Sequence, residues 1–382
     1  MKLPIRILVA LLCAAIILSM PFSLSSPQML DNEKTRLMLD DGEEDEAEDD
    51  ESEEIDFGRF LFSSACAEEA GEDQNSDDET IVETYVEGEL HINPEWKLPL
   101  DFSVPPMPNP DKYTENGYED QSIRVTVETR TINGMTVNIA FVEIADASQL
   151  RTAVAYDVQN SRTSTFTAIA RSVNPVVAIN GDLYTQLPET KRFEIRMTEK
   201  IRTKTNNQKD ILIIDDLGDF HIFVRSKGLH KEDKPYYIEQ MRKEGRTIVN
   251  AMTFGPALVL NGEMVDQKPN KEAYHRFAIE YKNPRSAIGQ TGPLSYVMVI
   301  VEGRGENAGA TGQELAQIMY DLGCVQAYNL DGGNTAEMIM FGPADENGKL
   351  TTKFYFEGDK TAGDRGQKDI VYFATAVPES EW

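Results

Sequence analysis

Three short apolar runs, each ending at a carboxylate beside a glycine, most constrain what this chain can fold into. The runs are Val176–Asp182, Val297–Arg304 and Val325–Gly333. Each run predicts a strand, and the glycine ends it because a residue without a Cβ atom permits positive φ and close backbone approach. We therefore expect the ends of the three strands to converge on one cleft.

The third run places a carboxylate at the end of its strand, because Asp331 is followed by Gly332, Gly333 and Asn334. One interpretation is a ligand site in which the backbone N–H groups of those three residues face a ligand oxygen. The other is a tight turn in which Asp331 and Asn334 bond only to local backbone. The residues alone leave both interpretations open.

Five short blocks follow one another in a fixed order along the chain. They are Asn180–Asp182, Thr253–Val259, Pro284–Gly289, Glu302–Arg304 and Asn329–Gly333. In this order they resemble the phosphodiester glycosidase family, and the likeness covers roughly residues 120 to 377. The resemblance implies a hydrolase that cleaves a sugar linked through its anomeric carbon to phosphate.

That reaction implies a set of site residues. It needs stabilisation of an oxocarbenium-like centre, neutralisation of a phosphate leaving group and a positioned nucleophile or water, and carboxylates with arginines supply these functions. The expected catalytic residues are Asp331, as nucleophile or general base, with Asp182 or Glu302 as the second carboxylate. Arginines would bind phosphate in a bidentate manner. The expected substrate-binding residues are Asn180, Arg285, Arg304, Asn329, Gly332, Gly333, Thr335 and Arg365.

The chain departs from the family pattern at three positions. Relatives commonly carry a third glycine and a serine where this chain has Asn334 and Thr335, and commonly an aspartate where it has Glu302. Asn334 adds a side chain to a loop where a ligand would approach closely, so the substrate is left open. We expect an N-acetylglucosamine-like sugar-1-phosphodiester of the cell envelope or of extracellular glycans.

Two other functions remain as alternatives. One is a non-catalytic surface protein that binds anionic glycans. The other is a metal-dependent phosphodiesterase in which Asp182, Glu302 and Asp331 hold a divalent cation. For the first-ranked function we expect no cofactor and no metal, because the cysteines and histidines show no metal-ligand spacing. The expected partner is a sugar-phosphate or glycan substrate. Nucleic acid is excluded because a chain of net charge −28 without a basic stripe would be repelled by phosphates.

The beginning of the chain has its own composition. Lys2 and Arg6 precede the apolar run Ile7–Leu18, which predicts a signal peptide or an N-terminal anchor over residues 1–26. We therefore expect a secreted or membrane-anchored extracellular protein that associates with the cell surface through its N-terminus. Within the following segment, 27–80, residues 31–80 hold 22 Asp or Glu against 3 Lys or Arg, which is 19 of the 28 net negative charges. Such a segment predicts disorder.

The remainder predicts a proline-rich linker or wrapping arm over 81–119 and a catalytic domain over 120–382. The expected fold class is α+β, a mixed, largely antiparallel sheet with a few packed helices and the site at strand ends. Asn133-Gly134 predicts a hairpin, and Thr311 with Glu314 predicts a helix that begins with a capping box. The basic segment Leu183–Asn207, which includes Arg196, is either a lid over substrate phosphate or a set of cations that balances nearby acids.

Overall fold

The structure is a computed structural model that describes residues 89–158, 162–182, 193–203, 209–224, 241–268, 279–361 and 366–382. The chain divides into two compact units, Met1–Thr80 and Ile81–Trp382. The expected signal peptide or anchor and the acidic segment both fall within the first unit, and they lie outside the described residues. In the described part of the chain, no helix has the length and apolar character needed to cross a membrane.

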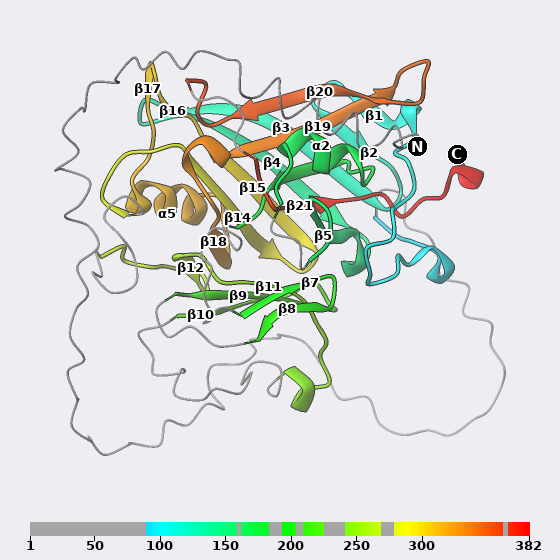
Figure 1. The fold of residues 1–382 in the computed structure, drawn as a ribbon, viewed down its shortest axis with the longest axis horizontal. Helices are drawn as coiled ribbons and strands as arrows, with labels where there is room; N and C mark the ends of the chain where they lie inside the picture. The colour runs from blue at the N-terminus through cyan, green and yellow to red at the C-terminus, as the bar shows by residue number, and fades with distance from the viewer. Residues whose placement is uncertain are drawn as a thin grey trace, which may run out of the picture. The chain divides into compact units, whose positions relative to one another are not determined.

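Nine of the described strands form the first sheet, in which every neighbouring pair is antiparallel (Figure 1). Its centre is the hairpin of β14 and β15, flanked by β4 on one side and β18 on the other. In spatial order the strands are β1 (Tyr113–Thr114), β2 (Gly117–Glu119), β3 (Ile123–Ile132), β4 (Met135–Ile144), β15 (Ser295–Val301), β14 (Arg285–Gly292), β18 (Gln326–Asn329), β12 (Ala257–Leu260) and β13 (Glu263–Met264).

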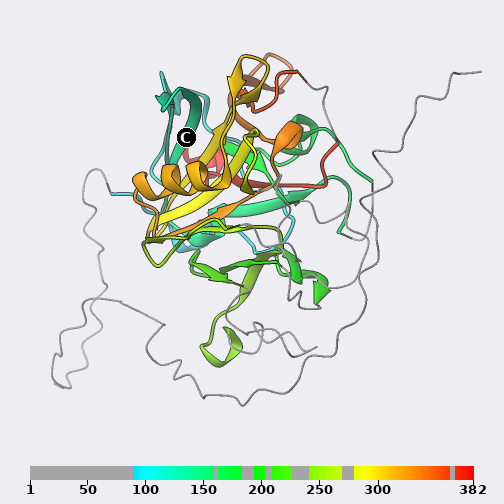
Figure 2. The same ribbon diagram turned by 90° about the vertical axis from the view of Figure 1, so that its left-hand side faces the viewer.

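Two further antiparallel sheets have five described strands each. The second sheet has the order β20 (Leu350–Glu357), β19 (Glu337–Ala344), β6 (Val177–Asn180), β21 (Asp369–Phe373) and β5 (Leu150–Val154). The third sheet has the order β10 (Phe220–Phe223), β9 (Ile211–Asp215), β11 (Ile248–Met252), β7 (Phe193–Arg196) and β8 (Glu199–Thr203), and it lies below the strands of the other two in both views (Figures 1 and 2). A short ribbon joins β16 (Gly303–Arg304) to β17 (Asn307–Ala308).

The central strands are apolar throughout because both of their faces are buried. In β15, Met298 and Ile300 point into the core that the three sheets share, while Val299 points into the core under helix α5 (Gly312–Asp321). In β6, Ile179 faces the shared core and Ala178 faces a separate core that includes helix α2 (Phe166–Arg171). Successive side chains of a strand point to opposite faces, so a strand covered on both sides reads as a continuous apolar run.

Helices α5 and α2 each begin at a threonine whose side chain caps the first turn. Thr311 accepts a hydrogen bond from the N–H of Glu314, whose carboxylate accepts from the N–H of Thr311, and this completes the capping box of α5. The Thr165 hydroxyl caps α2 by accepting from Ala168 at 3.2 Å. Helix α5 buries Leu315, Ile318 and Met319 against the first sheet. The helix expected to begin at Thr311 with a capping box is therefore confirmed.

The proline-rich segment is held against the domain by a buried arginine. The Arg151 guanidinium donates to the carbonyl oxygens of Pro99, Asp101 and Ser103 at 2.9, 2.7 and 3.2 Å. Two short 3-10 helices, η3 (Pro94–Trp96) and η4 (Pro110–Lys112), interrupt the segment, and β1 and β2 then join it to the first sheet. The described part of this segment is thus hydrogen-bonded to Arg151 and contributes two strands to the first sheet.

The predicted fold class needs one correction. Largely antiparallel sheets with few helices are confirmed, but the fold is more β-rich than α+β implies, since the described residues hold twenty-one strands and two fully bounded α-helices. The lid interpretation is wrong for the described part of Leu183–Asn207. Residues 193–203 form the β7–β8 hairpin of the third sheet, and Arg196 is fully buried. The other residues of that segment lie outside the described part.

Candidate active site

Two of the three predicted strand ends lie at the same end of the first sheet. Strand β14 begins at Arg285 between the ends of β15 and β18. Glu302 follows β15 directly, and Asp331 follows β18 after one intervening residue. The N–H of Leu330 donates to the Ser286 carbonyl at 2.9 Å and so extends the pairing past the end of β18. Because one strand separates them, the backbones of Glu302 and Asp331 lie roughly 10 Å apart, two interstrand spacings.

The third strand end reaches Asp331 from the second sheet. The Asn180 side-chain amide, at the end of β6, donates to the Asp331 carbonyl at 2.7 Å, and the Asp331 N–H donates to the Gly181 carbonyl at 3.2 Å. The side-chain oxygen of Asn180, Oδ1, accepts from the N–H of Glu337, the first residue of β19, at 3.2 Å. The main chain of Asp331 is therefore fixed on both sides, while its side chain is half-buried.

The glycines beside the carboxylates allow the backbone to pack closely around Pro284. A Cβ atom on Gly303 would lie 2.6 Å from the Pro284 nitrogen, and one on Gly332 would lie 2.7 Å from the Pro284 oxygen. A Cβ atom on Gly358 would lie 2.9 Å from the Pro284 Cβ. Real Cβ atoms do not approach so closely, because cores are packed to van der Waals contact. The acid–glycine pattern at Gly303 and Gly332 is thus a packing requirement of the converging strand ends.

The Gly332–Thr335 loop is hydrogen-bonded both to Pro284 and within itself. The Gly333 N–H, at φ 69°, donates to the Pro284 carbonyl at 2.9 Å, so the expectation that this N–H faces a ligand is wrong. The Thr335 hydroxyl donates to the Gly332 carbonyl at 2.8 Å and is buried. Neither bond involves the side chain of Asp331 or Asn334, so the turn interpretation stays a prediction.

Of the two predicted arginines that the structure describes, Arg285 is buried and Arg304 remains partly exposed. Its side chain is 46% exposed, it pairs with the Asp359 carboxylate, and its guanidinium lies 3.4 Å from where a Cβ on Gly333 would be. Burial alone would raise the pKa of the Asp359 carboxyl, but hydrogen bonds from Thr361 and the charge of Arg304 outweigh it and hold that pKa below its ordinary value. Arg304 thus lies beside the loop that carries Asp331.

Glu302 is buried among polar partners. Its carboxylate accepts from the side chains of Asn138 at 3.2 Å and Asn307 at 2.9 Å, and it pairs with Lys360 at 3.0 Å. The Lys360 side chain is 63% exposed, whereas the Glu302 side chain is 9% exposed, so the ammonium faces solvent and the carboxylate is buried. Lys360 is a cation that the sequence interpretation did not select.

Two other predicted substrate ligands are bonded within the protein. The buried Arg285 guanidinium donates to the carbonyls of Ala310 at 2.8 Å and Tyr281 at 2.7 Å, and burial lowers the pKa of Arg285 to about 10. The buried Asn329 amide donates to the Gly255 carbonyl at 2.8 Å. These contacts shape the strand ends. Arg365 lies outside the described residues.

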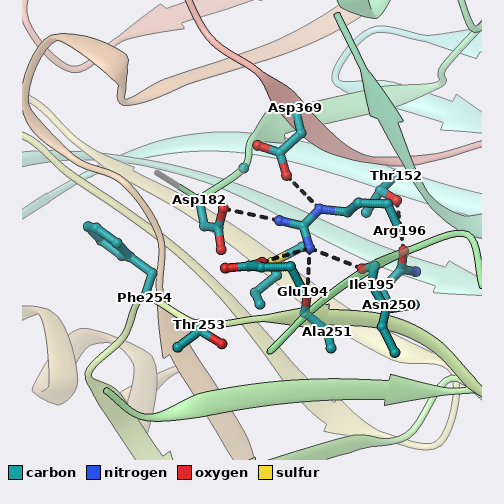
Figure 3. A network of polar contacts seen from close by, with 12 residues as sticks. Thr152, Asp182, Glu194, Ile195, Arg196, Asn250, Ala251, Thr253, Phe254 and Asp369 are labelled. Carbon is teal, nitrogen blue, oxygen red and sulfur yellow. Dashed lines mark hydrogen bonds and ion pairs between the residues drawn. The ribbon is translucent and has the colours of Figure 1, made fainter. Parts of the chain in front are cut away.

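A buried cluster lies next to the Asn180–Asp182 turn (Figure 3). Arg196 contacts three carboxylates: Asp182 at 3.0 Å, Asp369 at 2.7 Å and Glu194 at 3.2 Å. All four side chains are 0% exposed. We call Arg196, Asp182, Glu194 and Asp369 the Arg196 cluster. It joins the third sheet, through β7, to the ends of β6 and β21 in the second sheet.

Sequence reasoning missed most of this cluster. Glu194 and Arg196 stand two apart in one strand, so they point to the same face, and an ion pair between them was readable from that spacing. Asp369 begins an apolar strand, as the other candidate acids end one. Burial raises the pKa of Asp369 to about 7, the negative charge of Asp182 acts in the same direction, and Arg196 opposes both.

Among the described residues, no group of three or more His, Cys, Asp and Glu side chains could hold a metal ion, so Asp182, Glu302 and Asp331 do not form such a group. Two cavities in the described part of the chain lie elsewhere. One of about 400 Å³ is lined by residues including Asp120 and Arg124, and one of about 270 Å³ by residues including Tyr156.

Comparisons with known proteins match parts of the chain. The family model described as phosphodiester glycosidase matches residues 173–372, more than half of the chain. A prophage-derived uncharacterized protein of Bacillus subtilis, YomE, is 32% identical over 95 residues, which are 24% of this chain and 14% of that protein. The chain thus matches only a small part of that relative's length.

Two solved structures align with the chain at low identity. The catalytic domain of zebrafish N-acetylglucosamine-1-phosphodiester α-N-acetylglucosaminidase, auto-inhibited by its pro-peptide, aligns at 16% identity and a TM-score of 0.46 over 66% of this chain and 83% of its own. A Synechocystis protein described as hypothetical aligns at 17% identity and a TM-score of 0.45 over 66% of this chain and 62% of its own. The match of the family model extends over more than half of the sequence, and the chain belongs to the phosphodiester glycosidase family.

Proposed function

We propose that this protein is a secreted or surface hydrolase that cleaves an N-acetylglucosamine-like sugar-1-phosphodiester at the anomeric carbon. Its substrate would be a cell-envelope or extracellular glycan. Membership of the phosphodiester glycosidase family supports the reaction class. The secretion, the sugar and the glycan are our proposals, and the N-terminal sequence motivates the first of them.

One observation carries the assignment of residues. Asp331 is half-buried with its main chain fixed on both sides, and the partly exposed Arg304 lies beside the same loop. A substrate can reach an acid and an arginine that are exposed to this degree, whereas Asp182, Arg285, Asn180 and Asn329 are buried. We therefore assign direct substrate contact to Asp331 and Arg304 and a positioning role to the buried residues.

The proposed reaction breaks the bond between the anomeric carbon and the phosphate oxygen. Water supplies the new oxygen on that carbon, and the products are a free sugar and a phosphate monoester. Asp331 acts as nucleophile or general base at the anomeric carbon. A backbone hydrogen bond joins Gly303 to Gly358. Arg304 follows the first glycine, Lys360 is two residues beyond the second, and these two cations would neutralise the leaving phosphate. Phosphate leaves readily, so little general-acid assistance is required.

The test uses the purified full chain with UDP-N-acetylglucosamine and a second N-acetylglucosamine phosphodiester. Asp331→Asn removes the nucleophile or base and should lower the rate of sugar release roughly 10²- to 10⁴-fold with an unchanged unfolding midpoint. Asp321→Asn, at an exposed aspartate that ends α5, is the matched control and should retain the wild-type rate. The anomer released, read by NMR, separates a nucleophile, which retains configuration, from a general base, which inverts it.

The same assay tests the alternatives. If the chain binds a glycan saturably but releases no product, and Asp331→Asn binds equally well, the protein is a non-catalytic glycan-binding protein and not a hydrolase. Loss of release in chelator, restored by a divalent cation, would favour the metal-dependent phosphodiesterase. Release that survives chelation and disappears in Asp331→Asn supports anomeric cleavage.

A further inference from the structure

Asp369 packs directly onto the backbone of Gly181. The Gly181 N–H donates to the Asp369 carbonyl at 3.1 Å, and a Cβ atom on Gly181 would lie within 2.7 Å of all three carboxyl atoms of Asp369. Moving the Asp369 carboxylate away from Gly181 would cost free energy, because its side chain is 0% exposed and it accepts a hydrogen bond from the Arg196 Nε at 2.7 Å. Gly181 is therefore required for this contact.

We propose that Asp369 and Arg196 are positioning residues of the candidate site, whose buried ion pair fixes the Asn180–Gly181–Asp182 turn and, through that turn, the main chain of Asp331. Two residues of the turn contact the pair. Arg196 contacts the Asp182 carboxylate at 3.0 Å, and Asp369 contacts Gly181. The turn then bonds the N–H and the carbonyl of Asp331. This inference deepens the proposed function and rests on it.

The charges around Asp369 make this arrangement sensitive to pH. Asp369 is faced by Arg196 from β7, by Asp182 from the end of β6 and by the charge of Lys368 beside it, and Glu194 lies on the other side of Arg196. Burial raises the pKa of Asp369 to about 7, so its carboxyl is protonated in mildly acidic solution and ionises near neutrality. Ionisation of Asp369 adds a negative charge next to Asp182, and the Arg196 guanidinium contacts both carboxylates through different nitrogens.

A double-mutant cycle tests the packing. Gly181→Ala should lower the unfolding midpoint of the wild-type chain by at least about 4 °C, and by less than half as much in an Asp369→Ala background, where the obstructing carboxyl is gone. Gly292→Ala is the matched control, since a Cβ there meets nothing within 4 Å. It should leave the midpoint unchanged in both backgrounds. Equal penalties for Gly181→Ala in both backgrounds would overturn the proposal.

A second variant keeps the proposal testable if Asp369→Ala does not fold. Asp369→Asn still offers an oxygen to Arg196 but cannot ionise. The folded-state pKa of Asp369 is raised above its ordinary 3.8, so the wild-type chain loses stability as pH rises from about 4 to about 7, and the Asn variant does not. The pH profile of kcat/KM should likewise lose an inflection near 7. An identical pH dependence of wild type and variant would contradict the proposal.

The two proposals fail separately. Unfolding midpoints need no substrate, so coupling between Gly181 and Asp369 together with undiminished sugar release in Asp331→Asn would remove the proposed function and leave the packing intact. If the losses in unfolding midpoint of Gly181→Ala and Asp369→Ala are additive while Asp331→Asn abolishes sugar release, the positioning role is contradicted and the proposed function stands.

Discussion

The side-chain amide of Asn180 donates a hydrogen bond of 2.7 Å to the main-chain carbonyl of Asp331, across 151 residues of sequence. The same side chain accepts from the N–H of Glu337, so one buried asparagine joins the ends of β6 and β18 to the start of β19. The relationship explains how a carboxylate in the first sheet is held by the second sheet. It also predicts what happens when the amide is removed.

Asn180→Ala should lower the free energy of unfolding by about 2–4 kcal/mol, because it leaves a buried carbonyl and a buried N–H without this partner. Sugar release should fall at least tenfold at a temperature where the variant is folded. Urea unfolding and the release assay measure the two effects. Asn347→Ala, at an exposed turn residue, is the control and should change neither. Lost stability with a wild-type rate would restrict Asn180 to a purely structural role.

Arg304→Ala should raise KM for a phosphodiester roughly tenfold or more, since a charged hydrogen bond to phosphate contributes about 1.5–3 kcal/mol. Arg304→Lys should recover only part of this loss, because an ammonium cannot bind phosphate with two parallel bonds. Arg242→Ala removes an exposed arginine from another part of the chain and serves as the control. An unchanged KM in Arg304→Ala would argue that its guanidinium serves Asp359 alone.

Arg285→Lys should reduce stability without a selective change in KM. The lysine cannot reach both the Ala310 and the Tyr281 carbonyls, and it leaves a buried cation with fewer partners. Thermal unfolding and steady-state kinetics on the same preparation separate the two effects. A raised KM at unaltered stability would restore Arg285 to the phosphate site that its sequence position suggested.

Asp359→Asn should destabilise the chain at neutral pH, and the deficit relative to wild type should shrink only in acid. The folded-state pKa of Asp359 is held below its ordinary 3.8, so the ionised carboxylate stabilises the fold above that value and loses this contribution as pH falls through the lowered pKa. Unfolding midpoints measured from pH 7 down to pH 3 provide the test. A deficit that narrows already between pH 7 and pH 5 would contradict this ionisation.

The sequence predicted most of the local structure. The Asn133-Gly134 hairpin and the capping box of α5 depend on neighbouring residues, and both are confirmed. Strand ends beside glycines were predicted from apolar runs that end in an acid and a glycine. The glycines are needed for a different reason than expected, because Gly303 and Gly332 leave room for Pro284 and not for a ligand.

The parts of the site that sequence reasoning missed depend on partners far away in the chain. Arg196 and Asp369 are 173 residues apart, and no local pattern relates them. Arg196 was predicted only as one cation of a basic segment, either in a lid or balancing nearby acids, and the fold buries it in β7 beside three carboxylates, as the second alternative expects. Exposure was equally hidden: Arg285 and Arg304 look alike in sequence, and only the fold buries one and leaves the other partly open.

The reach of Arg196 between two sheets has a consequence for how the molecule opens. Arg196 belongs to the third sheet and Asp369 to the second, and Thr152 of β5 is likewise bonded to Asn250 of β11 at 2.7 Å. Separating these sheets would withdraw the guanidinium from a buried carboxylate, so neither can loosen alone at low cost. Amide protons of β6, β7, β11 and β21 should therefore exchange with deuterium as one cooperative unit, at a rate set by a single opening event.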